Sequence, residues 1–145
     1  MGQQQLLLLV LSTVIVGLAT VAGIQAFSEN QEKATQDALV QRAINIGNDV
    51  LAAHNEPSQF GGTNLNDNPD ASDVATAAGY DSNTKISADG GGDNAECKIT
   101  QSSKTATVEC GSDGSTSGNQ TVTVEVDPSK SDNKVQTTLI NGSSV

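Results

Sequence analysis

Aromatic and basic side chains are scarce in this chain. Its 145 residues include two Phe, one Tyr and no Trp, so a folded domain must build its core from aliphatic side chains, helix packing and cross-links. Seven Lys and Arg stand against 17 Asp and Glu, which gives a formal net charge of −10. A nucleic-acid partner would require a basic surface, so the charge balance argues against one.

Residues suited to catalysis are equally scarce. His54 is the only histidine, and its position near the predicted end of a helix indicates a solvated side chain. No Walker A motif or dinucleotide-binding fingerprint occurs, and the three glycines at 90–92 are typical of a turn. We therefore predict that the protein is not an enzyme and has no catalytic residue and no cofactor.

Two groups of acidic residues and two glycosylation sequons are the other candidate sites. The acids have spacings that could suit Ca²⁺, but neither group matches an EF-hand loop, so solvated carboxylates are favoured and no metal site is predicted. The sequons are weak signals, because Ser, Thr and Asn are abundant in this chain. The residues are the acids Asp67, Asp70, Asp73, Asp89 and Asp93, and the possible glycosylation sites Asn119 and Asn141.

Charge is absent from the first 28 residues, and within them lies a long apolar run, residues 6–27. As a helix, this run would extend ~33 Å, enough to span the hydrocarbon core of a bilayer. A cleavable secretory signal is disfavoured, because residues 1–5 lack Lys and Arg and the run is too long. A membrane anchor and a helix that leaves the membrane to pack in a filament core are the remaining interpretations, and the second is favoured.

The helix is predicted to continue through residues 28–55, which contain no Pro, and to end before Pro57. Gly17, Gly23 and Gly47 are expected weak points, although small residues in the apolar part also let helices approach closely. Apolar residues of the second part recur at steps of three and four and form one stripe. The stripe consists of Leu39, Ala43, Ile46, Val50 and Ala53, widened by Val40, Ile44 and Leu51.

Residues 57–95 are rich in Gly, Asn and Asp and are predicted to form an acidic loop. A short helix is compatible with residues 73–78. Because apolar residues are few in this loop, Phe60 and Tyr80 are expected to pin it to the rest of the protein.

The last third of the chain is predicted to form four antiparallel strands. Setting Cys97 opposite Cys110 places both on the same face as the apolar residues between them, so one register serves a disulfide and the hydrophobic pattern. In an exported chain, such a pair of cysteines predicts a disulfide rather than a metal site. The same register sets Ile99 opposite Val108 and Gln101 opposite Ala106, with the turn at Ser103 and Lys104. The expected strands are residues 96–101, 105–110, 121–126 and 134–140, with Val122, Val124 and Val126 as the third inward row and Val135, Thr137 and Leu139 as the fourth.

These features together resemble a type IV pilin. The order of predicted elements resembles that of a type IV pilin over the whole chain, whereas the resemblance of individual residues covers only the N-terminal third. It implies an α+β fold in which a long helix, apolar in its first half and amphipathic in its second, packs on a small four-stranded antiparallel sheet. The expected parts are an apolar filament-core or transmembrane half-helix (1–27), an amphipathic half-helix (28–56), the acidic loop (57–95) and the sheet with its disulfide (96–145).

The resemblance also implies how the N-terminus is made and used. A prepilin peptidase would remove a short leader, which leaves Met1 as a methylated N-terminus. The family carries Glu at the fifth mature position, where this chain has Gln5, and often Pro at position 22, where it has Ala22 followed by Gly23. Since Gln accepts hydrogen bonds without charge, Gln3, Gln4 and Gln5 are expected to bond to each other or to the termini of neighbouring copies in the filament. The expected assembly residues are Met1, Gln5, Leu6, Gly17 and Gly23.

The expected function is therefore that of a structural subunit. Identical copies would polymerise through the N-terminal helix into an extracellular filament that serves adhesion, motility or surface attachment. Before assembly, the subunit would lie in the inner membrane and meet the pilus assembly machinery. The disulfide and the short sheet favour a bacterial over an archaeal filament. The alternatives are a membrane-anchored extracytoplasmic module, whose acidic loop binds cations or a partner, and a minor pilin or pseudopilin of a secretion system.

Overall fold

The computed structural model describes residues 2–114, 120–140 and 143–144. It divides into two compact units, residues 1–34 and residues 35–145, which we describe separately; the second is called the head. The predicted N-terminal assembly residue Met1 and the two possible glycosylation sites, Asn119 and Asn141, lie outside the described residues.

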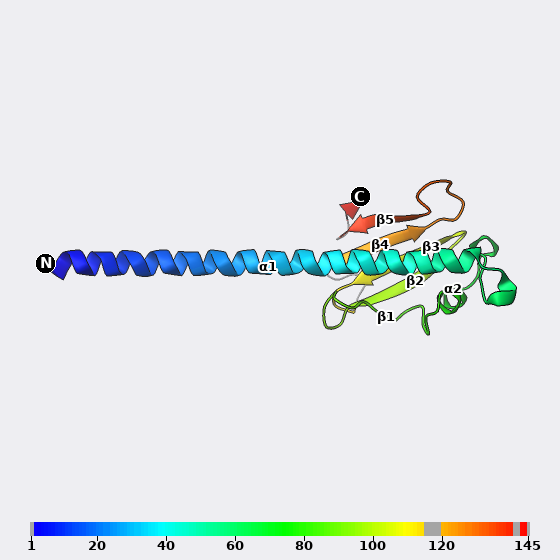
Figure 1. Ribbon diagram of the computed structural model, residues 1–145, viewed down its shortest axis with the longest axis horizontal. Helices are drawn as coiled ribbons and strands as arrows, with labels where there is room; N and C mark the ends of the chain where they lie inside the picture. Colours follow the sequence, from blue (N-terminus) through cyan, green and yellow to red (C-terminus); the bar gives the residue numbers. More distant parts are fainter. Residues whose placement is uncertain (1, 115–119, 141–142, 145) are drawn as a thin grey trace. The chain divides into compact units, whose positions relative to one another are not determined.

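Helix α1, Gly2–Asn55, confirms the predicted helix and contributes to both units (Figure 1). It ends two residues before Pro57, whose backbone is extended, with φ −62° and ψ 143°. In the head, the buried side of α1 is the predicted stripe, and the flanking residues Val40, Ile44 and Leu51 pack partly buried against the same core. Periodicity alone therefore identified the face that α1 turns to the sheet.

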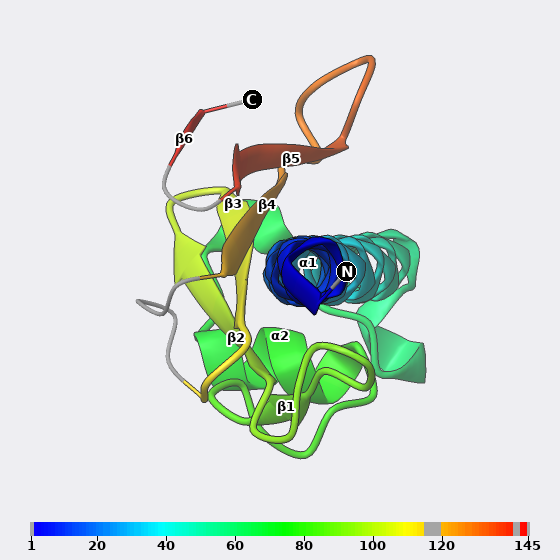
Figure 2. The same cartoon turned by 90° about the vertical axis from the view of Figure 1, so that its left-hand side faces the viewer.

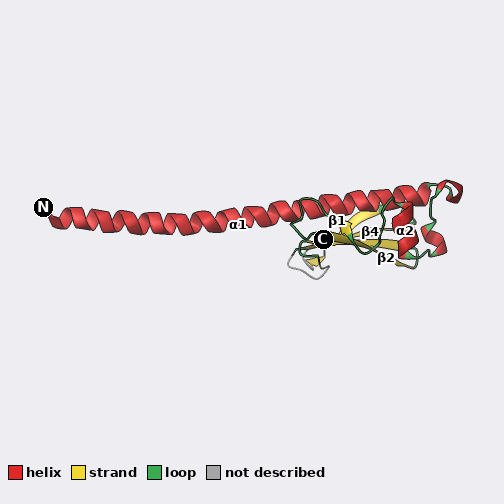
Figure 3. Ribbon diagram, turned by 90° about the horizontal axis from the view of Figure 1, so that it is seen from below, coloured by secondary structure: helices red, strands yellow, loops and turns green. Residues whose placement is uncertain are grey.

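The sheet is a meander in which every strand pairs antiparallel with its neighbours in sequence. The four predicted strands are confirmed as β2–β5, and α1 lies against one face of the sheet within the head (Figures 2 and 3). The two edge strands were not predicted, because two residues are too few for an alternating pattern. The strands are β1 Ile86–Ser87, β2 Glu96–Ser102, β3 Thr105–Gly111, β4 Thr121–Val126, β5 Val135–Ile140 and β6 Ser143–Ser144.

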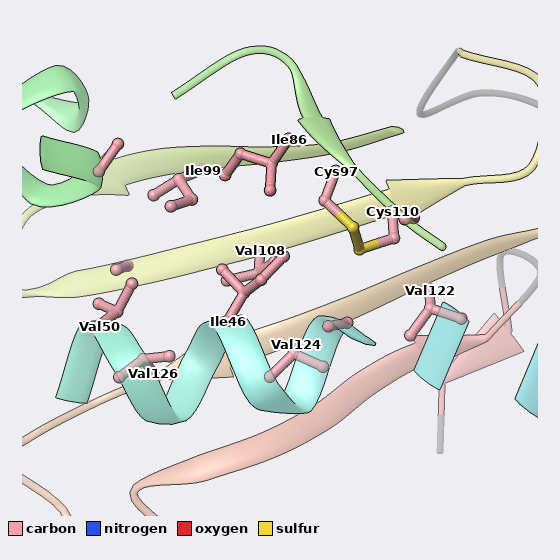
Figure 4. Close-up of a cluster of buried hydrophobic side chains, with 14 of the residues drawn as sticks. Ile46, Val50, Ile86, Cys97, Ile99, Val108, Cys110, Val122, Val124 and Val126 are labelled. Carbon is pink, nitrogen blue, oxygen red and sulfur yellow. A yellow bond between two sulfur atoms is a disulfide. The ribbon is translucent and has the colours of Figure 1, made fainter. Parts of the chain in front are cut away.

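The register between β2 and β3 is the predicted one. Cys97 faces Cys110 with their Cα atoms 4.0 Å apart, and the two are joined by a disulfide. The turn falls at Ser103, whose φ of +55° is left-handed, and Lys104. Figure 4 shows the disulfide within the same layer of buried side chains as Val108.

The pairing of β5 with β4 departs from the regular register that the predicted fourth inward row assumes. A register shift between Thr123 and Val124 leaves Thr138 of β5 as an extra residue, because Thr123 pairs with Leu139 and Val124 pairs with Thr137. Consequently Thr137 still pairs with Val124, but Ile140, not Leu139, pairs with Val122. A β-bulge of this kind leaves no mark in an alternating pattern.

The connector between α1 and β2 has more structure than the predicted loop. It contains two 3₁₀ turns, η1 Ser58–Phe60 and η2 Leu65–Asp67, and helix α2, Ala71–Ala77, which bears out the short helix. The expectation that Phe60 pins it is wrong, because that side chain is 80% exposed. Leu65 and Val74 supply fully buried side chains instead.

Tyr80 does attach the connector to α1. Its hydroxyl donates to Asp49 Oδ2 at 2.6 Å, and the Arg42 guanidinium lies 5.8 Å from the ring centroid. Arg42 Nε also donates to the carbonyl of Ser87 in β1 at 3.0 Å. Burial and then the bond to Asp49 raise the pKa of Tyr80 to about 12, so the hydroxyl stays protonated as a donor at physiological pH.

Gly47 holds α1 close to the sheet. A Cβ at this position would lie 2.9 Å from Val135 Cγ1 and 3.3 Å from methyl groups of Val124 and Val126. The expected weak point of the helix is therefore the residue whose missing side chain makes room for valines of β4 and β5. Its partners come from strands about 80 residues further on, so the sequence around Gly47 gave no indication of this contact.

Replacing Gly47 by Leu is expected to destabilise the head by roughly 1–3 kcal/mol, because a side chain here must displace stiff β-branched valines. Urea unfolding of the full chain in detergent micelles, followed by circular dichroism, measures the change. Gly17→Leu is the matched control, since nothing lies within 4 Å of its Cβ position. Equal unfolding midpoints for Gly47→Leu and the parent would contradict this assignment.

Candidate functional site

The largest uncovered feature of the described residues is the apolar half of α1, which we define as residues 6–27. Its large apolar side chains are each between 52% and 68% exposed. Outside this segment, Phe60 is the one large apolar side chain among the described residues that is similarly exposed. Apart from Phe60, no large apolar side chain among the described residues of the head is this exposed, whereas the apolar half of α1 remains uncovered.

This segment is long and apolar enough to cross a membrane. An 18-residue window of α1 reaches a mean hydropathy of 2.5, and none of that window is buried. A membrane anchor and a signal sequence both have these properties. The segment can therefore be covered by lipid or by other protein, and it is poorly suited to water.

The hydroxyl groups of the segment already have partners in the helix itself. Ser12 Oγ donates to the carbonyl of Leu9 at 2.9 Å, and Thr13 Oγ1 donates to that of Val10 at 2.8 Å. Thr20 Oγ1 donates to the carbonyl of Val16 at 2.8 Å. Because these donors are satisfied internally, they can enter an apolar environment without losing a hydrogen bond.

The glutamines differ from the hydroxyls. Gln3, Gln4, Gln5 and Gln25 are exposed, and none of these amides bonds to another part of the described chain. Each carries two donors and an acceptor, so burial of this helix elsewhere requires partners for them. Consecutive residues of an α-helix point about 100° apart, so residues 3–5 direct amides around much of its circumference.

The other predicted assembly residues are also open to contact. Leu6 is 66% exposed, and a Cβ at Gly17 or Gly23 would meet nothing within 4 Å. These residues lie along one helix and do not form a shared pocket in the single chain. Their glycines cost helix stability without a compensating contact in this chain.

A second feature lies in the head, where α1 ends. His54 Nδ1 accepts a hydrogen bond from the backbone N–H of Leu65 at 3.1 Å. The imidazole is partly buried, so it is less solvated than the sequence indicates. It lines an open, mainly polar cavity of about 640 Å³. The other lining residues are Glu56, Pro57, Ser58, Gly62, Thr63, Asn64, Asn66, Asp67 and Pro69.

The acidic residues do not gather into a metal site. No group of three or more His, Cys, Asp or Glu that could hold a metal ion occurs among the described residues. The two cysteines are buried and cross-linked, and so supply neither a nucleophile nor a ligand.

Comparison with known proteins adds no relative: no family model, no curated protein and no solved structure matches the chain. The fold and the uncovered helix are therefore the grounds for a functional proposal.

Proposed function

We propose that this protein is a structural subunit that polymerises with identical copies into a type IV pilus-like filament on the cell surface. The observation that carries the proposal is the uncovered, uncharged apolar half of α1, continuous in sequence with a head whose core is complete without it. The apolar halves would form the filament core, and the heads would form its surface.

Energetics support burial of the helix but not spontaneous release from a bilayer. At ~25 cal/mol per Å² of apolar surface, removing the segment from water contributes on the order of tens of kcal/mol. Lipid covers the same surface nearly as well, so transfer from lipid to a protein core gains much less. A membrane-embedded subunit would therefore need assembly machinery to extract it.

A membrane-anchored module is the second candidate, because the mean hydropathy and length of α1 suit an anchor equally well. Electron microscopy of material sheared from cells, with antibodies against the head, distinguishes the two. Filaments labelled along their whole length support the major-subunit proposal, and sparse labelling indicates a minor subunit. Monomers found only in the membrane fraction would overturn the filament proposal.

Gln5 provides a test of the contacts between copies. Gln5→Leu is expected to lower filament yield several-fold, because it leaves polar groups of a neighbour without a partner in an apolar core, at a cost of several kcal/mol. Gln5→Glu is expected to be tolerated or to improve assembly, since a carboxylate can pair with a neighbour's N-terminal amine. The measurement is filament yield per cell at matched subunit expression.

Gln4→Leu makes the same chemical change on another side of the helix, so comparison with it shows whether a loss of filaments is particular to position five. If Gln5→Leu assembles as well as the parent, Gln5 is not an assembly contact. The proposal would then rest on the apolar half of α1 and the head alone.

A further inference from the structure

The end of α1 is joined to η2 by a hydrogen bond that exists in only one protonation state of a side chain. Leu65 N–H donates to His54 Nδ1, so this nitrogen must carry no proton and the proton of the neutral ring is on Nε2. Leu65 is itself fully buried in the core. The bond therefore fixes the start of η2 over the last turn of the helix.

Some groups around His54 disfavour the protonated imidazole, and others favour it. Partial burial, followed by the positive charge of Lys134, lowers the pKa of His54 below its ordinary value of 6.5. Two carboxylates, Glu56 and Asp67, line the same cavity and would attract an imidazolium. The net direction is downward, so the ring is neutral, and the bond is formed, at neutral pH.

Other bonds limit what a change at His54 can release. Just before η2 in the chain, Thr63 N–H donates to the carbonyl of Ala53 in α1 at 3.0 Å. Asn64 accepts from the backbone N–H of Asn66 and caps η2 locally. The backbone whose hydrogen bond to α1 depends on the imidazole is therefore short, residues 64–67, and the buried Leu65 side chain still holds this segment to the core.

We propose that the contact between His54 and Leu65 is a pH-sensitive latch, which opens residues 64–67 away from the end of α1 when the imidazole is protonated. Protonation replaces an acceptor with a donor that faces the Leu65 N–H, and it adds a second positive charge beside Lys134. Opening enlarges the polar cavity and changes the surface of the head next to the exposed Phe60. The proposal concerns the head and does not depend on filament assembly.

The sign of the pH dependence follows from the lowered pKa. Between the folded and unfolded values, the unfolded or opened state binds more protons than the latched state. The latch is therefore fully formed above the ordinary histidine value of 6.5 and is lost as the pH falls through the lower, folded value.

Amide hydrogen exchange, measured by NMR on the full chain in detergent micelles between pH 8 and 5, tests the latch. Exchange rates are divided by the intrinsic rate at each pH, so that protection factors are compared. Protection of the Leu65 amide is expected to fall about tenfold on acidification, the loss of one hydrogen bond. The Tyr80 amide, which donates to the carbonyl of Ala75 at 2.9 Å, should keep its protection.

Two substitutions separate the titration from the fold. In His54→Asn, the side-chain oxygen can take the place of Nδ1 as an acceptor and does not titrate, so the Leu65 amide should stay protected throughout. In His54→Leu, it should be unprotected at every pH. Constant protection of Leu65 in the parent, an equal loss in His54→Asn, or a simultaneous loss at Tyr80 would each overturn the latch.

Discussion

Asp in place of Val14 is expected to abolish filaments while leaving the head folded. Val14 is 53% exposed in the single chain and lies in the middle of the uncharged apolar half of α1. In a filament core its side chain would be covered by other copies, and an unpaired carboxylate there costs several kcal/mol at every subunit. A cost repeated at each subunit should reduce assembly by orders of magnitude.

Electron microscopy counts the filaments of Val14→Asp, and circular dichroism of the detergent-extracted subunit reports the head. Val14→Leu is the matched control, because it keeps the position apolar and should assemble as the parent does. The amount of subunit in the membrane fraction shows whether the variant still inserts. Normal filaments from Val14→Asp, or from Leu18→Arg, would remove the basis for a core made of these helices.

Removal of the disulfide is expected to lower the free energy of unfolding of the head by roughly 2–4 kcal/mol. Cys97 and Cys110 face each other on β2 and β3, and both are fully buried. The head has few large rings with which to compensate, and the total stability of a domain is only ~5–15 kcal/mol. Replacement of both by Ser should therefore remove a large fraction of the stability.

Urea unfolding of the double Ser variant measures this loss, and a double Ala variant separates the cross-link from the burial of two hydroxyls. Ser should cost more than Ala, because each buried hydroxyl needs a hydrogen-bond partner. Mass spectrometry of an unreduced digest identifies the bridge directly. Two free thiols in that digest would contradict the assigned pairing.

The features that could be predicted from sequence are those with a local period. Leu39, Ile46 and Val50 recur with the helical repeat, and their burial follows from that repeat. Cys97 and Cys110 lie on strands joined by a two-residue turn, so one pairing fixes every other pair between β2 and β3.

The features that were missed depend on residues far apart in the chain. Gly47 has no room for a side chain because Val135 packs against it. His54 accepts a hydrogen bond because η2 brings the Leu65 N–H to the end of α1. Phe60 is predicted to pin the connector because apolar residues are few there, but its side chain is exposed and Leu65 provides the buried anchor instead. The tertiary fold sets the contacts of Gly47, His54 and Leu65, so no local sequence pattern indicates them.

The sequence of the apolar half of α1 does not indicate whether lipid or protein covers it. The pattern that predicts its helix is the same in lipid and in a protein core, and the exposed side chains in the single chain do not choose between them. Partners outside the chain decide which environment covers this segment, and substitutions at Val14 and Gln5 test for a protein core.

The meander order of the sheet has a consequence for the timing of folding. Every strand pairs with its neighbours in sequence, so the contacts of the sheet close short loops and favour rapid folding. Helix α1 is translated before the strands, yet its stripe from Leu39 to Ala53 is buried against strands that follow it in the chain. Until β5 is complete, the nascent chain therefore exposes two apolar surfaces, the apolar half of α1 and the stripe in the second half of the helix. A membrane or chaperone that covers the apolar half of α1 during translation would reduce aggregation in this interval.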